Sequence, residues 1–285
     1  MNVVFKLDDI NSVVFSGGGS RCLWQAGVWT VLSQTSAFKP SAIAAASAGA
    51  TMVSLLLTGN AEKGLDYFKT VTGNNRKNAY WSNLFSKKPV FPHFDIYKKA
   101  IFDLIEEDDI KKLKTAPEVR VLISQPPSWL GPRSGSVIGI ASYSLEKLLR
   151  YPMHPTFSRK LGYRSLMVSM SECSSVSELA DLLLQSSCTP PFVPVMKRNG
   201  KPALDGGLID NVPVSALSDK PGLKLVLLSR QYPMDKIPKH SDRFYFQPSE
   251  SITVSKWDYT NPEGLQFAYD LGKKDAVNLL NSLEV

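Results

Sequence analysis

The sequence predicts an α/β domain built on a mainly parallel central sheet. Short apolar segments typical of buried strands alternate along the chain with longer segments of helical periodicity. At two expected strand-to-helix junctions, residues 16–20 and 44–50, the chain contains only glycine, alanine and serine. Small residues allow a tight turn close to neighbouring strands. The 285 residues show no repeat or clear linker, so a single domain over residues 1–285 is expected.

The first half of the chain starts with strand and helix patterns in alternation. The apolar runs 12–15 and 41–46 predict buried strands, and apolar residues recur at helical spacing after each of them. Asp95 is typical of a helix N-cap. Strands are therefore expected at residues 3–7, 12–15, 41–46 and 119–123, helices at 22–34, 51–57 and 95–105, and irregular structure at 62–94.

The second half continues the alternation less regularly. The acidic residues 106–109 are expected to form a solvated helix end without a metal-ligand pattern. Residues 223–228 are strongly apolar and predict a buried strand. Further strands are expected at 163–170 and 244–246, helices at 143–150, 177–185 and 264–283, and a loop at 125–135.

Composition and charge restrict the class of protein but do not select its partner. Hydrophobic residues make up 43% of the chain and charged residues 21%, which is typical of a globular protein. The net charge of +7 favours anionic partners, whether nucleic acid, anionic lipid headgroups or acidic substrates. The three cysteines, Cys22, Cys173 and Cys188, are too few for a disulfide framework or a zinc site, and we expect them to be reduced.

The sequence predicts a cytoplasmic protein that can bind peripherally to membranes. Residues 1–9 lack the basic and apolar parts of a secretory signal peptide. Residues 40–61 carry no charge, but Pro40, Gly49 and Gly59 argue against a transmembrane helix there. Neither a signal peptide nor a transmembrane helix is expected.

The first glycine-rich turn contains Gly17, Gly18 and Gly19 between a strand and a helix. Its backbone N–H groups could bind an anion at the helix N-terminus. A dinucleotide site is disfavoured, because Cys22 stands where its third glycine belongs and no acidic residue ends the next strand. An oxyanion hole and a plain tight turn remain as interpretations.

Ser20 and Arg21 follow this turn and are candidates for contact with an anionic substrate. A cation at a helix N-terminus is unfavourable by roughly 0.3–1 kcal/mol, so Arg21 is expected to have a compensating partner. Either an anionic ligand or a buried carboxylate would serve.

The second turn presents Ser47 between a strand and a helix. Ala45 and Gly49 flank it at the two glycine positions of the G-x-S-x-G pattern, in which serine lies exposed on a sharp turn. The alternative is a helix-packing segment of small residues with an incidental serine. Far downstream, Asp205 is followed by Gly206 and Gly207, which would allow a sharp turn that fixes the carboxylate at a sheet edge.

Residues 76–92 interleave aromatic and basic side chains. Such mixtures suit a lipid interface, with rings at headgroup depth and cations on phosphates. They would also suit single-stranded nucleic acid, but a loop packed by its own aromatics is the leading interpretation.

The glycine turn, the Ser47 turn and the D-G-G motif together resemble the patatin-like phospholipase family. Residues 187–192 and 210–214 are similar to the segments that flank D-G-G in that family, and the likeness extends over about residues 13–276. It implies a three-layer α/β/α sandwich with a mainly parallel sheet, related to α/β-hydrolase-type architectures. Ala45 and Cys22 depart from the family's glycines without removing a reacting group.

The resemblance implies a lipid acyl hydrolase of the phospholipase A or lysophospholipase type. Ser47 would form an acyl-enzyme, Asp205 would accept its proton, and the N–H groups of the glycine turn would bind the oxyanion. No cofactor, metal or nucleic acid is implied, and the expected partner is a membrane phospholipid or another acyl-ester lipid. Ala45, Gly49, Gly206 and Gly207 would support the two turns.

Two other functions remain open on the sequence alone. One is a serine esterase or thioesterase acting on soluble acyl compounds, and the other is a non-catalytic lipid-binding module. A Ser-His-Asp triad is not expected, because none of the three histidines lies in a motif that would place it beside Ser47. His93, His154 and His240 are expected to be surface or loop histidines.

Overall fold

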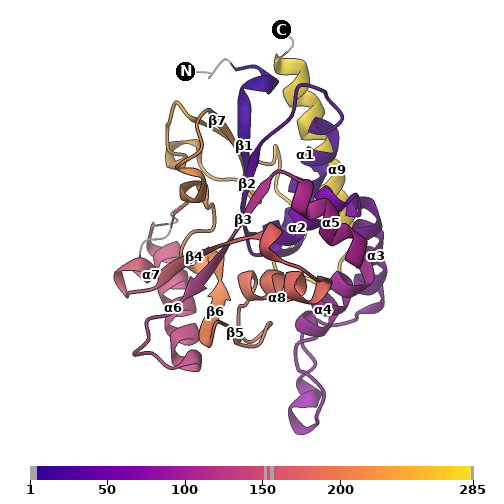
Figure 1. The fold of residues 1–285 in the computed structure, drawn as a ribbon. Coiled ribbons are helices and arrows are strands. Elements are labelled where there is room, and N and C mark those ends of the chain that lie inside the picture. The colour runs from indigo at the N-terminus through magenta and orange to yellow at the C-terminus, as the bar shows by residue number, and fades with distance from the viewer. Residues whose placement is uncertain (1–4, 151–152, 155–156, 284–285) are drawn as a thin grey trace.

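The computed structural model describes residues 5–150, 153–154 and 157–283. Within these residues, eight strands form one sheet in the order β5-β6-β3-β2-β1-β7-β8, and β4 also pairs with β3 (Figure 1). Strands β3, β2, β1, β7 and β8 run parallel to their neighbours in this row, while β4, β5 and β6 are added antiparallel. The strands are β1 (Ile10–Phe15), β2 (Ala42–Ala46), β3 (Glu118–Gln125), β4 (Arg164–Ser169), β5 (Met196–Arg198), β6 (Lys201–Asp205), β7 (Leu223–Leu227) and β8 (Arg243–Phe246).

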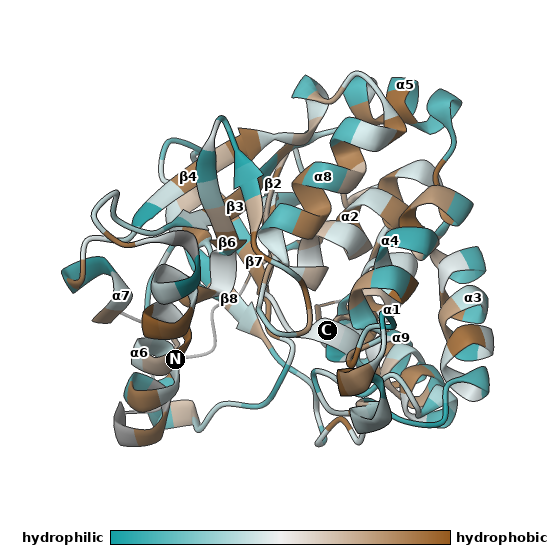
Figure 2. Ribbon diagram, turned by 90° about the horizontal axis from the view of Figure 1, so that it is seen from below, coloured by the Kyte–Doolittle hydropathy of each residue, from teal (hydrophilic) through white to brown (hydrophobic). Residues whose placement is uncertain are grey.

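Helices cover the two faces of the sheet unequally, as the view from below shows (Figure 2). Helices α1, α2, α4, α5 and α8 lie on one side, with α3 and α9 beyond them, and α6 and α7 lie on the other. This is the predicted α/β/α arrangement with a mostly parallel sheet. The helices are α1 (Leu23–Leu32), α2 (Ala48–Thr58), α3 (Ala61–Asn74), α4 (His93–Leu104), α5 (Glu107–Thr115), α6 (Pro132–Arg150), α7 (Phe157–Lys160), α8 (Val176–Ser186) and α9 (Pro262–Leu283).

The core follows the period-two alternation of the central strands. Val13 and Phe15 of β1 belong to the large hydrophobic cluster, whereas Val14 belongs to a smaller cluster on the opposite face. Ile43 and Ala44 of β2 divide in the same way. Because both faces are buried, these strands are apolar at consecutive positions, as is typical of parallel sheets.

Several expected elements differ from the structure. Residues 61–74 form α3 instead of irregular chain, because helix packing against α4 and α9 compensates for the glycines and threonines of that segment. Helix α6 begins at Pro132, inside the expected loop, and α4 begins at His93, two residues before Asp95. Leu7 starts a 3-10 turn instead of ending a strand, and residues 1–4 of that expected strand lie outside the described residues.

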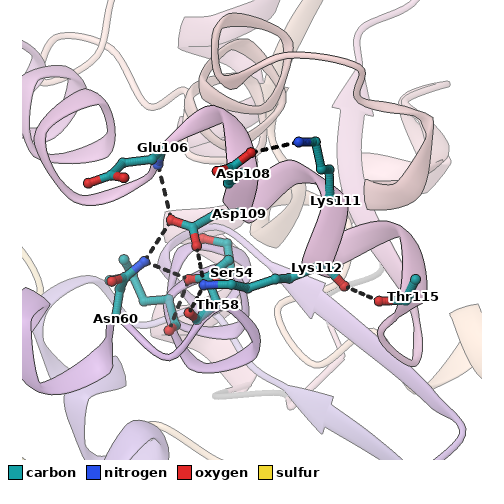
Figure 3. Close-up of polar contacts among 10 residues, drawn as sticks. Ser54, Thr58, Asn60, Glu106, Asp108, Asp109, Lys111, Lys112 and Thr115 are labelled. Atoms are coloured by element: carbon teal, nitrogen blue, oxygen red, sulfur yellow. Dashed lines mark hydrogen bonds and ion pairs between the residues drawn. The ribbon is translucent and has the colours of Figure 1, made fainter.

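The acidic cluster is partly buried, contrary to the expectation of a solvated helix end. Asp109 is 5% exposed and accepts hydrogen bonds from the side chains of Asn60 at 2.9 Å and Lys112 at 2.7 Å (Figure 3). Lys112 also donates to the carbonyl of Thr58, the last residue of α2. Burial opposes the charge of Asp109, but these hydrogen bonds outweigh it and lower its pKa. The network fixes the C-terminal end of α2.

In the described part of the chain, no helix has both the length and the apolar character needed to cross a bilayer.

Candidate active site

Ser47 occupies the single position between β2 and α2. Its backbone has φ 55° and ψ −138°, a left-handed conformation that serine rarely adopts. Its N–H donates to Ser186 Oγ at 2.9 Å, and that hydroxyl donates in turn to the carbonyl of Leu122 at 2.8 Å. A Cβ on Gly49 would lie 2.8 Å from the carbonyl oxygen of Ser16. The sharp turn expected from the small residues is therefore present.

Asp205 lies beside Ser47 although 158 positions separate them. Ser47 Oγ donates to Asp205 Oδ2 at 2.8 Å, and both residues are 2% exposed. Thr189 Oγ1 donates to the same carboxylate oxygen at 3.0 Å, and the N–H of Gly207 donates to Oδ1 at 2.7 Å. These contacts fix both oxygens, so the carboxylate can face the serine in only one orientation.

Close packing explains the glycines after Asp205. A Cβ on Gly206 would lie 2.3 Å from the carbonyl oxygen of Leu122 in β3. A Cβ on Gly207 would lie 2.7 Å from Asn211 Oδ1. Side chains at these positions would push the carboxylate away from the sheet.

The first glycine turn is held by hydrogen bonds from distant loops. The carbonyl of Gly17 accepts hydrogen bonds from Asn211 Nδ2 at 2.9 Å and from Ser229 Oγ at 2.7 Å. The N–H of Gly17 donates to the carbonyl of Asn211 at 2.9 Å, so it is not available to an oxyanion, and the expectation for Gly17 is wrong. Within residues 5–150, 153–154 and 157–283, no acceptor forms a hydrogen bond with the N–H of Gly18 or Gly19.

An apolar cavity opens on the Ser47 side. We define it by Leu23, Met52, Phe68, Val193 and Leu265, which line it together with Ser47 and Gly19. Tyr97 and Tyr259 also line it, and burial raises the pKa of Tyr97 to about 12. A mostly apolar wall beside a serine hydroxyl suits a hydrocarbon chain.

His93 also lines the apolar cavity, so the expectation of a surface or loop position is wrong for this residue. It is 1% exposed, and burial lowers its pKa. Its Nε2 donates to the carbonyl oxygen of Trp257 at 2.9 Å, which partly opposes the lowering of the pKa, but burial dominates and favours the neutral ring. The hydroxyl of Ser47 is directed to Asp205 instead. His240 is exposed, as expected, and His154 is half-buried with Nδ1 2.9 Å from Asp210.

A second cavity adjoins Asp205, and we call it the cationic cavity. Arg21, Arg230 and Lys256 line it together with Thr189 and Asp205. Burial and the neighbouring Arg230 lower the pKa of Arg21. No carboxylate of the described residues lies within ion-pair distance of Arg21, whose Nε approaches the Gly18 carbonyl at 3.5 Å. Of the two interpretations of Arg21, pairing with a buried carboxylate is therefore wrong for the described residues.

Ser20 is placed differently from Arg21. Its hydroxyl donates to the carbonyl of Asp258 at 3.1 Å, and its N–H donates to the carbonyl of Lys256 at 3.2 Å. Ser20 lines the apolar cavity together with Lys256, but it does not line the cationic cavity that holds Arg21 and Arg230. Its hydroxyl fixes the segment that carries Lys256.

Sequence reasoning missed five residues of the site: Lys256, Ser229, Asn211, Thr189 and Ser186. Lys256 Nζ lies 3.9 Å from Asp205 Oδ2, and the residue lines both cavities. Ser229 follows the C-terminal end of β7, which is a usual place for site residues in a parallel sheet. That position was the available signal for Ser229, whereas Lys256 lies in a stretch without a motif.

Comparison with known proteins gives the chain a family. No curated protein matches it. The crystal structure of VipD from Legionella pneumophila is similar to it, with 15% sequence identity and a TM-score of 0.49 over 96% of this chain and 67% of that chain. The family model described as patatin-like phospholipase matches residues 13–218. This match covers well over half of the sequence, and the chain belongs to the patatin-like phospholipase family.

Proposed function

We propose that this protein is a phospholipase of the A or lysophospholipase type that acts through a Ser47–Asp205 dyad. The family supports hydrolysis of lipid acyl esters as the class of reaction. The observation that carries the finer proposal is the 2.8 Å hydrogen bond from Ser47 Oγ to Asp205 Oδ2. Because Ser47 lines the apolar cavity and Asp205 the cationic cavity, this bond lies where an acyl chain and a headgroup would meet.

The acylation step follows from this geometry. Ser47 Oγ attacks the ester carbonyl carbon, and its proton passes to Asp205 Oδ2. The N–H groups of Gly18 and Gly19 would bind the oxyanion, each worth about 2.7–4 kcal/mol in the transition state. The tetrahedral intermediate expels the alcohol of the lipid, which takes the proton from Asp205 and leaves an acyl group on Ser47.

Deacylation repeats these steps with water. A water molecule gives a proton to Asp205 and attacks the acyl carbonyl, and Ser47 Oγ leaves with that proton as the fatty acid is released. The N-terminus of α2 begins directly after Ser47 and stabilises negative charge on its oxygen. Thr189 and Gly207 keep the carboxylate oriented through both steps.

The two cavities support a phospholipid as the substrate. A fatty-acyl chain would be buried beside Met52 and Val193, at about 0.8 kcal/mol for each buried methylene. A phosphate group would be bound by Arg21 and Lys256 in the cationic cavity. A neutral lipid would bring no phosphate to these two side chains.

The test measures fatty-acid release from phospholipid vesicles and covalent labelling by a fluorophosphonate. Ser47→Ala is expected to abolish labelling, and both Ser47→Ala and Asp205→Asn to lower turnover by about 10³-fold or more. Ser54→Ala is the matched control, because that hydroxyl donates only within α2, to the carbonyl of Thr51 at 2.8 Å. Undiminished release by Ser47→Ala would falsify the dyad. Lipid binding without labelling of the wild type would instead support a non-catalytic module.

A further inference from the structure

A loop of residues 75–92 projects from the body of the protein and ends in apolar side chains. We call it the projecting loop, and it extends beyond α4 at the bottom of Figure 1. At its tip, the exposed fractions are 63% for Trp81, 62% for Leu84 and 97% for Phe85. Three large apolar side chains exposed on one 3-10 turn, Trp81–Phe85, form a patch of the kind that marks an interaction site.

Hydrogen bonds between its two arms give the projecting loop a defined shape. The N–H of Tyr80 donates to the carbonyl of Val90 at 2.8 Å, and Asn83 Nδ2 donates to the carbonyl of Pro89 at 2.8 Å. The N–H of Asn83 donates to the carbonyl of Tyr80 at 2.9 Å. The tip is therefore a closed turn that presents its rings outward instead of folding them back onto the protein.

The charge of the projecting loop selects the kind of partner. Arg76, Lys77, Lys87 and Lys88 are all exposed, and there is no aspartate or glutamate between Gly73 and Phe94. Basic residues beside a bilayer are attracted to anionic lipids, while tryptophan and phenylalanine are buried at headgroup depth. An apolar tip with basic flanks thus fits an anionic membrane surface.

The projecting loop is joined directly to the apolar cavity. At its base, Asn78 Nδ2 donates to Asp258 Oδ1 at 3.2 Å, and the N–H of Tyr259 donates to Asn78 Oδ1 at 2.7 Å. Tyr259 and its neighbour Trp257 line the cavity. The base of the loop and the wall of the cavity are therefore one hydrogen-bonded unit.

Aromatic rings connect the tip to the same wall. Trp81 contacts Phe91 with ring centroids 5.8 Å apart, and Phe91 contacts Phe192 at 5.0 Å. Phe192 stacks on Trp257 at 4.6 Å. A continuous row of rings runs from the exposed tip to the cavity in which we place the acyl chain.

We propose that the projecting loop docks the protein on anionic bilayers, with Trp81, Leu84 and Phe85 inserted and the four basic residues on lipid phosphates. The row of rings then provides an apolar path for an acyl chain from the membrane to Ser47. This second statement rests on the proposed function, whereas docking itself needs no catalysis.

Flotation of the full chain with vesicles tests docking. We expect binding to vesicles of phosphatidylcholine mixed with phosphatidylglycerol and weak binding to phosphatidylcholine alone. Phe85→Asp is expected to weaken binding at least about tenfold, because it removes a buried ring from the bilayer. Met234→Asp is the matched control, since Met234 is 74% exposed but lies outside the loop. The double variant Lys87→Glu, Lys88→Glu is expected to lose the preference for anionic vesicles.

Tryptophan fluorescence locates the inserted residue. Vesicles are expected to shift the emission to shorter wavelength in the wild type and in Trp129→Phe, which removes a 74% exposed tryptophan elsewhere. The shift is expected to disappear in Trp81→Phe.

The outcomes separate docking from catalysis. Ser47→Ala is expected to float as the wild type does, so an inactive protein that still floats would count against the dyad and not against docking. Equal flotation of Phe85→Asp and the wild type would overturn the docking proposal. So would a change from dimer to monomer in Phe85→Asp without a change in flotation, because the tip would then be a self-association surface.

Discussion

The apolar and cationic cavities differ in chemistry although a single hydrogen bond connects them. The apolar cavity takes its wall from helices α1, α2, α3, α4 and α9 and holds a neutral histidine. The cationic cavity takes Arg21 and Arg230 from loops that follow β1 and β7. Ser47 faces the first and Asp205 the second, while Lys256 and Trp257 line both.

This difference shows how a site can orient an amphipathic substrate. Helix faces turned toward a sheet are apolar, so a cavity between them favours hydrocarbon. Loops at the carboxyl ends of parallel strands carry polar side chains and backbone donors, and these favour charge. Under the proposed function, the ester would lie at the boundary, where Ser47 and Asp205 meet.

Filling the apolar cavity with a larger side chain is expected to have the largest effect on substrate preference. Met52→Trp is expected to lower kcat/KM for long-chain esters about 100-fold relative to short-chain esters, because several methylenes lose their burial at about 0.8 kcal/mol each. Rates with a series of soluble p-nitrophenyl esters measure the ratio. Met52→Leu, which conserves the side-chain volume, should leave it nearly unchanged. Equal losses at every chain length would show that Met52 does not bound the acyl path.

Removing a charge from the cationic cavity should affect only anionic substrates. Arg21→Gln is expected to lower kcat/KM for a phospholipid about 10- to 100-fold. This is the loss expected when a charged hydrogen bond, which contributes about 1.5–3 kcal/mol, is removed. Neutral diacylglycerol in the same detergent micelles should be hydrolysed at nearly the wild-type rate. Arg133→Gln, at an exposed position outside this cavity, is the control. A parallel loss on the neutral lipid would assign Arg21 to the structure of the glycine turn.

A change in the support of the glycine turn should affect both kinds of substrate alike. Ser229→Ala removes the 2.7 Å hydrogen bond to the carbonyl of Gly17. Since such a bond contributes about 1 kcal/mol, kcat is expected to fall about fivefold for phospholipid and neutral lipid together, with KM unchanged. Selective loss on one substrate would contradict a role in holding the turn.

The smallest effect concerns the neutral histidine of the apolar cavity. Burial lowers the pKa of His93, so the unfolded chain takes up the proton first as the pH falls below about 6.5. The stability that neutral His93 provides is therefore present above that pH and declines with acidification toward its folded pKa. Urea unfolding at pH 7.5 and pH 5 should show a smaller decline for His93→Gln. An identical decline in both proteins would argue against a buried neutral ring.

The sequence predicted the parts of the site that local motifs determine. Small residues around Ser47 indicated the turn, and the two glycines after Asp205 indicated a fixed carboxylate; the structure brings both side chains together. Gly17 was misjudged because its N–H finds an acceptor in Asn211, 194 positions away. Lys256 could not be predicted, because only the folded chain places its ammonium near Asp205.

The same limit applies to the fold. The buried central strands have continuous apolar runs and were expected close to their observed positions. Strands β4 and β8 were also expected, whereas the short antiparallel strands β5 and β6 were not. Helix α3 was missed because its stability comes from packing on α4 and α9, which a single segment does not reveal. Asp109 was expected in solvent because its burial depends on Asn60, which lies 49 positions away, whereas Lys112 is on the same helix.

The left-handed backbone of Ser47 has a consequence for how many substitutions the protein can tolerate. Holding a non-glycine residue at φ 55° and ψ −138° costs about 1–3 kcal/mol, whereas a whole domain is stable by only about 5–15 kcal/mol. An average substitution destabilises by about 1 kcal/mol. The backbone conformation of this one residue thus lowers the free energy of unfolding by as much as about one to three ordinary mutations would. Residues far from the site, such as those that hold the end of α2, therefore matter to the serine through the mutational robustness of the whole chain.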